Sequence, residues 1–260
     1  MSAVTIAGVG KTFTGHGRGD PPVVALQDVS FGVADREFCS ILGHSGCGKT
    51  TLLMLLAGFE QPSTGSIRVD GRPVGEPTWQ RTVVFQDYAL FPWMTVAENI
   101  AFGLEMKKVA QQARREIVAR NVALVGLGGF ERRYPHQLSG GMKQRVSIAR
   151  ALAVDPEVLL MDEPFAALDA QNRSRMQEEM GRILASVDPH VRKTMVLVTH
   201  SIEESILLSD HIVVLTRRPG RVKAEIRVGL PRPRSEMDPA FIAMKQRIRD
   251  LIHDEYEIEA

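Results

Sequence analysis

The sequence predicts an α/β fold with a mainly parallel sheet, because short β-branched runs alternate with longer helical patterns along most of the chain. Four apolar runs are each followed directly by polar residues. The runs lie at residues 38–42, 82–85, 158–161 and 194–199, and the polar residues are a glycine-rich loop, Gln86, Asp162 with Glu163, and His200. Since the carboxyl ends of parallel strands share one edge of a sheet, and ligands bind outside that edge, we expect these four sites to converge on one ligand.

A small antiparallel sheet is predicted before this core. The first 35 or so residues contain strand-like runs at 4–9 and 24–33, separated by a loop at 14–22 that holds Gly15, Gly17 and Gly19. Strand patterns then stop between Tyr88 and Ala153. Amphipathic patterns take their place and predict an inserted helical subdomain, about 88–153, with helices at 96–105, 111–125 and 141–153.

The part of the chain after His200 is predicted to hold a short helix at 202–208, a strand at 211–216, a turn at Pro219 and Gly220, and a strand at 221–228. A last helix follows, and its apolar residues share one face: Phe241, Met244, Ile248, Leu251 and Ile252. We therefore divide the chain into a main domain at 1–230 and a C-terminal helical tail at 231–260.

Composition narrows the classes of function. The chain has 260 residues, of which 44% are hydrophobic, and can bury a sizeable core. Its formal charge is only +1, so we expect no nucleic-acid partner. The amino terminus lacks a secretory pattern, and no apolar run approaches the roughly 20 residues of a membrane span, so a cytosolic location is expected. Cys39 and Cys47 are too few for a disulfide framework and should be reduced.

The glycine-rich loop GHSGCGKT, residues 43–50, is typical of a phosphate-binding P-loop between a strand and an apolar helix at 51–58. Its backbone N–H groups can surround phosphate oxygens, Lys49 can reach the β and γ phosphates, and Thr50 can offer a hydroxyl to magnesium. A plain glycine turn is the alternative. The candidate residues for ATP and Mg²⁺ are Gly43, His44, Ser45, Gly46, Cys47, Gly48, Lys49, Thr50 and Thr51. Because Cys47 lies inside the loop, we predict that alkylation of its thiol blocks ATP hydrolysis.

Asp162 and Glu163 predict the rest of the chemistry. The first acid after a buried strand holds the magnesium, and the second is placed to polarise a water for in-line attack on the γ phosphate. Glu163→Gln should therefore keep ATP binding and lose turnover. The alternative is that the two acids only cap the segment before Pro164.

Residues 138–144 read LSGGMKQ, and with the glycine loop, Gln86, VLLMDE at 158–163 and His200 they occur in the order of a known family. The chain resembles the nucleotide-binding subunit of an ATP-binding-cassette (ABC) transporter over roughly residues 1–230. The resemblance implies a P-loop NTPase core and a head-to-tail homodimer with two ATPs at its interface. It also implies that Ser139, Gly140 and Gly141 cap the γ phosphate of an ATP held by the opposite subunit. Met142 and Ala166 depart from the residues that the family often has.

Further roles follow from the resemblance, residue by residue. Phe13 matches the aromatic residue that stacks on adenine, with a buried strand phenylalanine as the alternative. Gln86 matches a glutamine that touches the magnesium site and links it to the helical subdomain. His200 matches a histidine that contacts the γ phosphate, and Asp169 matches an aspartate at the dimer interface. The implied catalytic residues are Glu163, His200, Gln86 and Lys49, and the implied metal site is Thr50, Gln86 and Asp162.

Two surface segments remain open to more than one interpretation. The first contains Tyr88, Leu90, Phe91, Trp93 and Met94, and either lines a groove for a short helix of a membrane subunit or belongs to the core of the helical subdomain. The second is basic, and is interpreted as a solvated hairpin balanced by an acidic tail, with an effector or lipid site as the alternative. Its residues are Arg217, Arg218, Arg221, Lys223, Arg227, Arg232 and Arg234, and those of the tail are Asp254, Glu255, Glu257 and Glu259.

Within the family, residues 91–104, 161–170 and 217–222 look most like the ATPases of importers for nitrate, sulfonates, taurine and related small anions. That resemblance implies transmembrane permease subunits, an indirect periplasmic or lipid-anchored solute-binding protein, and a peripheral location on the cytoplasmic face of the membrane. The alternatives are a soluble, non-transport ATPase of the same family and the ATPase half of an exporter.

Overall fold

A computed structural model of the chain describes residues 2–14, 21–166, 173, 176–177, 180–181 and 193–253. Its central sheet has the strand order β10-β9-β3-β8-β7-β6. The strands are β3 Phe38–Leu42, β6 Arg81–Val84, β7 Val158–Asp162, β8 Thr194–Thr199, β9 His211–Leu215 and β10 Val222–Arg227. Only β10 runs antiparallel to its neighbour, so the predicted parallel core is confirmed.

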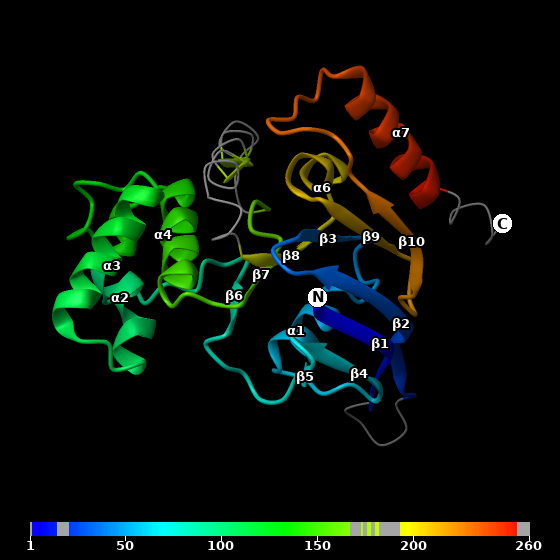
Figure 1. The fold of residues 1–260 in the computed structure, drawn as a ribbon, viewed down its shortest axis with the longest axis horizontal. Helices are drawn as coiled ribbons and strands as arrows, with labels where there is room; N and C mark the ends of the chain where they lie inside the picture. The colour runs from blue at the N-terminus through cyan, green and yellow to red at the C-terminus, as the bar shows by residue number, and fades with distance from the viewer. Residues whose placement is uncertain are drawn as a thin grey trace.

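The parallel strands are buried on both faces. Every residue of β3, β7, β8 and β9 is buried, as expected for strands covered by layers on each side. Helix α1, Lys49–Ala57, packs between this sheet and a second, antiparallel one (Figure 1). The carboxyl ends of the strands are thereby held at one edge, where the loops that follow them can meet.

The second sheet has the order β2-β1-β4-β5 and confirms the antiparallel unit predicted at the N-terminus. Its strands are β1 Ser2–Phe13, β2 Val23–Ala34, β4 Thr64–Val69 and β5 Arg72–Pro73. The β4–β5 hairpin was not predicted. Its turn is Asp70–Gly71, with φ of 47° and 76°, and this Asp-Gly pair is the sequence signal that could have revealed it. The predicted Gly15, Gly17 and Gly19 lie outside the described residues.

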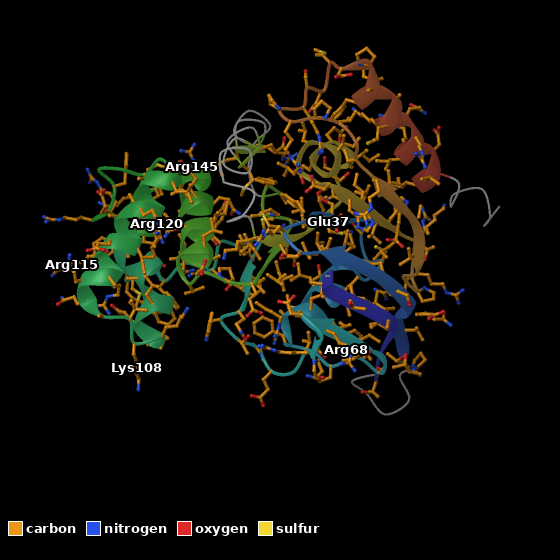
Figure 2. The ribbon with its side chains drawn as sticks, viewed as in Figure 1. Glu37, Arg68, Lys108, Arg115, Arg120 and Arg145 are labelled. Carbon is orange, nitrogen blue, oxygen red and sulfur yellow. The ribbon has the colours of Figure 1, made fainter. Side chains whose placement is uncertain are left out.

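A helical lobe stands to one side of the two sheets (Figure 1). It contains α2 Val96–Met106, α3 Gln111–Leu124, the short 3-10 helix η1 Pro135–Gln137 and α4 Gly140–Ala153. The hydroxyl of Thr95 accepts a hydrogen bond from Glu98 N, and the Glu98 carboxylate accepts one from Thr95 N, which fixes the start of α2. Apolar residues such as Ile100, Val122 and Val146 form a core of the lobe's own. Charged side chains such as Lys108 and Arg115 project outward (Figure 2).

The last part of the chain packs against the core sheet. Helix α6, Ile202–Leu208, follows β8, and helix α7, Pro239–His253, lies over it. Phe241 and Ile248 are buried in this contact, with Met244, Leu251 and Ile252 packed beside them, so the predicted apolar face is confirmed. None of the described helices is long and apolar enough to cross a membrane.

Candidate nucleotide site

The loop between β3 and α1 has the geometry of a phosphate cradle. Gly46 and Gly48 adopt positive φ, and a Cβ on Gly48 would lie 2.7 Å from Leu26 Cδ2 and 2.9 Å from Ala25 O, so only glycine fits there. Lys49, the first residue of α1, is 5% exposed and donates from Nζ to the carbonyls of Gly43 at 2.9 Å and His44 at 2.8 Å. Its ammonium is thus fixed at the loop, where a phosphate can meet it.

Asp162 and Thr50 meet beside this loop. Asp162 ends β7, and its Oδ1 accepts a hydrogen bond from Thr50 Oγ1 at 3.2 Å. Burial is the main cause that raises the pKa of Asp162, and the nearby Glu163 adds to it, while the Thr50 hydrogen bond and the charge of Lys49 oppose it. A buried carboxylate beside a hydroxyl is a set of oxygen ligands that suits Mg²⁺, and the charge of the ion would stabilise the ionised carboxylate.

Glu163 and His200 form the next pair along the same edge. Glu163 Oε2 lies 3.0 Å from His200 Nδ1, although 37 residues separate them. Glu163 has a φ of 42°, in the left-handed region that glutamate rarely adopts, and its N–H donates to Val198 O at 2.9 Å. A strained backbone at this position is typical of a functional residue, since it re-aims the side chain at the end of a strand.

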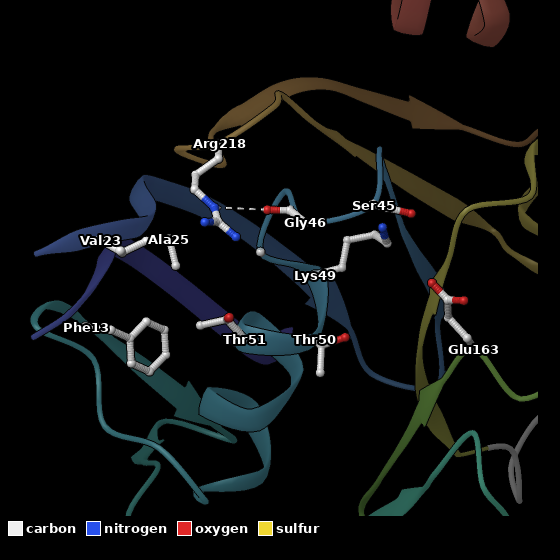
Figure 3. A pocket seen from close by; sticks show the side chains of 11 residues that line it. Phe13, Val23, Ala25, Ser45, Gly46, Lys49, Thr50, Thr51, Glu163 and Arg218 are labelled. Atoms are coloured by element: carbon white, nitrogen blue, oxygen red, sulfur yellow. Dashed lines mark hydrogen bonds between the residues drawn. The ribbon is translucent and has the colours of Figure 1, made fainter. Parts of the chain in front are cut away.

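A cleft of about 250 Å³ lies between the phosphate loop and Glu163 (Figure 3). Phe13 lines it and is 37% exposed, so the alternative of a buried strand phenylalanine does not describe this residue. The other predicted residues that line the cleft are Ser45, Gly46, Gly48, Lys49, Thr50, Thr51 and Glu163. An aromatic ring, a phosphate loop and a carboxylate around one cleft can hold a nucleoside triphosphate together with a nucleophilic water.

Cys47, for which we predict that alkylation blocks ATP hydrolysis, is buried in the structure. Cys47 is 1% exposed, and its Sγ lies only 2.8 Å from the position that a Cβ on Gly43 would take. The thiol therefore fills space under the loop instead of facing the cleft. A reagent could reach it only if the loop opened.

Other predicted residues lie away from the cleft. Gln86 follows β6 and is exposed. Ser139 caps α4 by accepting a hydrogen bond from Met142 N at 3.3 Å, and Gly140 and Gly141 begin this helix in the lobe (Figure 1). A Cβ on Gly141 would meet nothing within 4 Å, so the packing of this chain does not require a glycine there. Asp169 lies outside the described residues.

Val23, Ala25 and Arg218 also line the cleft, and the sequence analysis did not assign them to it. Arg218 belongs to the basic stretch, and its only sequence signal is that it directly precedes the predicted turn at Pro219 and Gly220. The interpretation of that stretch as a solvated hairpin is wrong for Arg232 and Arg234, which are half-buried. Arg232 pairs with Asp210, and Arg234 donates to the carbonyls of Ile206, Ser209 and Leu230, whereas Arg227 pairs with the buried Glu37 and stays exposed. The acidic residues at 254–259 lie outside the described residues.

Partial burial lowers the pKa of the Arg234 guanidinium. Its guanidinium donates to the carbonyls of Ile206 and Ser209, each at 2.6 Å, and to Leu230 at 3.0 Å. Burial first, and then the charge of Arg232, lower the pKa of Arg234 to about 10. This side chain ties the C-terminal segment to α6, the helix that follows His200.

The segment at 88–94 is partly packed into the helical lobe and partly exposed. Leu90 packs against the core of the lobe, whereas Trp93 is 69% exposed. The buried amide of Asn99 holds the backbone of the segment, accepting from Phe91 N at 2.9 Å and donating to Met94 O at 3.0 Å. Arg150 donates to the carbonyls of Ala89 and Tyr88 at 2.7 and 3.1 Å. A rigid backbone thus presents an aromatic residue to solvent.

Comparisons with known proteins agree with this geometry. A family model described as ABC transporter matches residues 26–166. An uncharacterized ABC transporter ATP-binding protein of Methanocaldococcus jannaschii is 48% identical over 233 residues, covering 90% of this chain and 86% of that protein. The nitrate import ATP-binding protein NrtD of Synechococcus elongatus is 41% identical, covering 94% of this chain and 89% of that protein.

The chain also matches longer proteins and solved structures. The bicarbonate transport ATP-binding protein CmpC of Synechococcus elongatus is 43% identical over 252 residues, but the chain spans only 37% of its length. A dimeric ATP-binding cassette, solved in a post-hydrolysis state with ADP and Pi, is 29% identical with a TM-score of 0.74 and covers 88% of this chain and 100% of its own. Together with the phosphate loop and the carboxylate facing it, these matches show that the chain belongs to the ABC transporter family and is an ATPase.

Proposed function

We propose that this protein is the ATP-hydrolysing subunit of an import system, and that it couples ATP-driven dimer closure to the uptake of a small anion through a separate permease. The observation that carries the proposal is the single cleft that joins Phe13, the phosphate loop and Glu163. The nitrate and bicarbonate transport relatives support import of a small anion. Their names make nitrate and bicarbonate candidate solutes, and the family resemblance of the sequence adds sulfonates and taurine.

Hydrolysis follows from the residues at the sheet edge. Glu163 accepts a proton from a water whose oxygen attacks the γ phosphorus, while the bond between that phosphorus and the β–γ bridging oxygen breaks and ADP leaves. Lys49 holds the β and γ phosphates, and His200, 3.0 Å from Glu163, orients the carboxylate and contacts the γ phosphate. Thr50 and Asp162, which meet in the structure, would hold Mg²⁺ together with Gln86, and the ion would neutralise phosphate charge when bound.

The exposed start of α4 supports the dimer. The N-terminus of this 14-residue helix, with Ser139, Gly140 and Gly141, presents backbone N–H groups that can cap an anion. In the proposed head-to-tail dimer these groups cap the γ phosphate of the ATP bound to the second copy, and Asp169 lies at the interface. Only a triphosphate can contact both the phosphate loop of one copy and the N-terminus of α4 of the other, so ATP closes the dimer and hydrolysis reopens it.

The exposed Trp93 and its rigid segment support docking of a permease at the helical lobe. Gln86 lies two residues before this segment in the sequence, so a change at Gln86 is passed to the segment along a few residues. The protein would then act as a peripheral subunit on the cytoplasmic face of the membrane. A periplasmic or lipid-anchored binding protein would deliver the solute to the permease without touching this chain.

Copurification from native membranes tests the proposal. The tagged protein is expected to recover a polytopic permease and, through it, a solute-binding protein. A soluble complex with nucleic acid, or recovery of a permease that moves its solute outward, would contradict import. Binding of each candidate anion to the recovered solute-binding protein would then identify the solute.

A further inference from the structure

The turn between β9 and β10 is packed onto the nucleotide cleft. Gly220 N donates to Ala25 O at 2.9 Å, and Gln27 N donates to Gly220 O at 2.9 Å, so the turn continues the edge of β2. A Cβ on Gly220 would lie 2.2 Å from the carbonyl oxygen of Cys47. Only glycine allows this approach, and the turn therefore rests directly on the phosphate loop.

The inside of the turn is held by its own hydrogen bonds. Thr216 N donates to Arg221 O at 2.9 Å, and the Thr216 hydroxyl accepts from Arg221 N at 2.9 Å and contacts Pro219 O at 3.0 Å. The Arg221 guanidinium donates to the side chain of Gln27 on β2 at 2.7 Å. These hydrogen bonds fix the backbone on both sides of the residues at the tip of the turn.

Arg218 lies at the tip of this turn and lines the cleft. Its Nε donates to Gly46 O at 3.3 Å, and its Nη2 lies 3.8 Å from the position of a Cβ on Gly46. Figure 3 shows the guanidinium against the loop, with Phe13 across the cleft. Within the described part of the chain, Nε is the only nitrogen of this guanidinium with a hydrogen bond, which leaves both Nη groups for a ligand.

We propose that Arg218 binds the α and β phosphates of the nucleotide and is a specificity-determining residue of the cleft. A guanidinium has donors but no acceptor, and its planar fork matches the oxygens of a phosphate. It lies at Gly46, beside the loop N–H groups that face phosphate, while Glu163 marks the γ-phosphate end of the site. Arg218 therefore holds ADP as firmly as ATP and does not act on the γ phosphate. This inference rests on ATP occupying the cleft, as in the proposed function.

Nucleotide binding to three variants tests the role. Arg218→Met keeps the aliphatic bulk and removes the charge, Arg218→Lys keeps the charge without the fork, and Arg217→Ala removes a neighbouring charge that does not line the cleft. Dissociation constants would be measured by calorimetry for Mg-ADP, and for adenosine by competition against a fluorescent nucleotide. Thermal unfolding would check that each variant is folded.

Arg218→Met is expected to weaken Mg-ADP binding on the order of tenfold, with Arg218→Lys in between and Arg217→Ala within about twofold of the unsubstituted protein. Adenosine binding should change by less than about twofold, because it has no phosphate. An unchanged constant for Mg-ADP, or an equal loss for adenosine, would overturn the role of Arg218 and leave the proposed function in place. Failure of the unsubstituted protein to bind Mg-ADP would overturn both.

Discussion

Glu163→Gln separates the proton-accepting role of Glu163 from its place in the structure. Glutamine has the same shape, and its amide oxygen can still meet His200 Nδ1 at the 3.0 Å that now separates carboxylate and imidazole. Thr50, Asp162 and Lys49 are untouched, so the grip on the phosphates should remain. What is lost is a base for the attacking water.

General-base help contributes about 10² to 10⁴ in rate, which corresponds to about 3–5 kcal/mol in the activation free energy. We therefore expect kcat for ATP hydrolysis to fall by that factor while the dissociation constant for ATP stays within about twofold. Phosphate release at saturating ATP and calorimetry with ATP would measure the two quantities.

Glu157→Gln is the matched control, since Glu157 precedes the opposite end of β7 and, in the described structure, its side chain accepts a hydrogen bond only from Gln80. Its kcat should be unchanged. If Glu163→Gln kept more than about a tenth of the normal kcat, or if Glu157→Gln lost as much, Glu163 would not be the base.

Three further variants test other features. Arg234→Met removes the hydrogen bonds at the end of α6 and should lower the free energy of unfolding by about 2–4 kcal/mol in urea, whereas Arg68→Met, which loses one exposed bond to Gly71, should change it by less than about 1 kcal/mol. Burial favours the protonated form of Asp162, so the ionised Asp162 side chain lowers the stability of the folded protein once the pH rises above the usual aspartate pKa. Asp162→Asn should therefore raise the melting temperature of the nucleotide-free protein at neutral pH, and this gain should be lost near pH 4. The same variant should abolish Mg²⁺-dependent turnover. Trp93→Ala should leave the free energy of unfolding within about 0.5 kcal/mol, because the side chain is 69% exposed, and should reduce recovery of the permease from membranes.

Each of these three predictions would be contradicted by a specific result. Equal losses for Arg234→Met and Arg68→Met would show that the bonds of Arg234 do not stabilise the end of α6. A melting temperature of Asp162→Asn that stays below the unsubstituted value at every pH would contradict the desolvation argument. Full permease recovery with Trp93→Ala would place the docking surface elsewhere.

The parallel core was predictable because its signals are local. Each buried strand is a continuous apolar run, and the polar residue that follows it lies at the edge where ligands bind. The meeting of Glu163 with His200, and of Thr50 with Asp162, is a consequence of that shared edge. Knowing the strands was therefore enough to predict that three distant segments meet: the phosphate loop with Thr50, Asp162 with Glu163, and His200.

The sequence predictions were wrong or incomplete where packing between distant parts of the chain decides the environment of a side chain. The basic stretch looks solvated in sequence, yet Arg218 faces the cleft because Gly220 docks on the phosphate loop, and Arg234 is half-buried because α6 ends beside it. Cys47 belongs to a loop that binds phosphate, but its thiol points under that loop. Periodicity and motif spacing carry no information about such contacts.

A crystal structure of Glu163→Gln with ATP and Mg²⁺ would test most directly whether two copies of this chain share each nucleotide. We expect Ser139 of one copy to lie within hydrogen-bond distance, about 3 Å, of the γ phosphate of an ATP whose other side is held by Lys49 of the second copy. An ATP-loaded protein in which Ser139 faces solvent, far from Lys49 of any neighbouring copy, would contradict the mechanism.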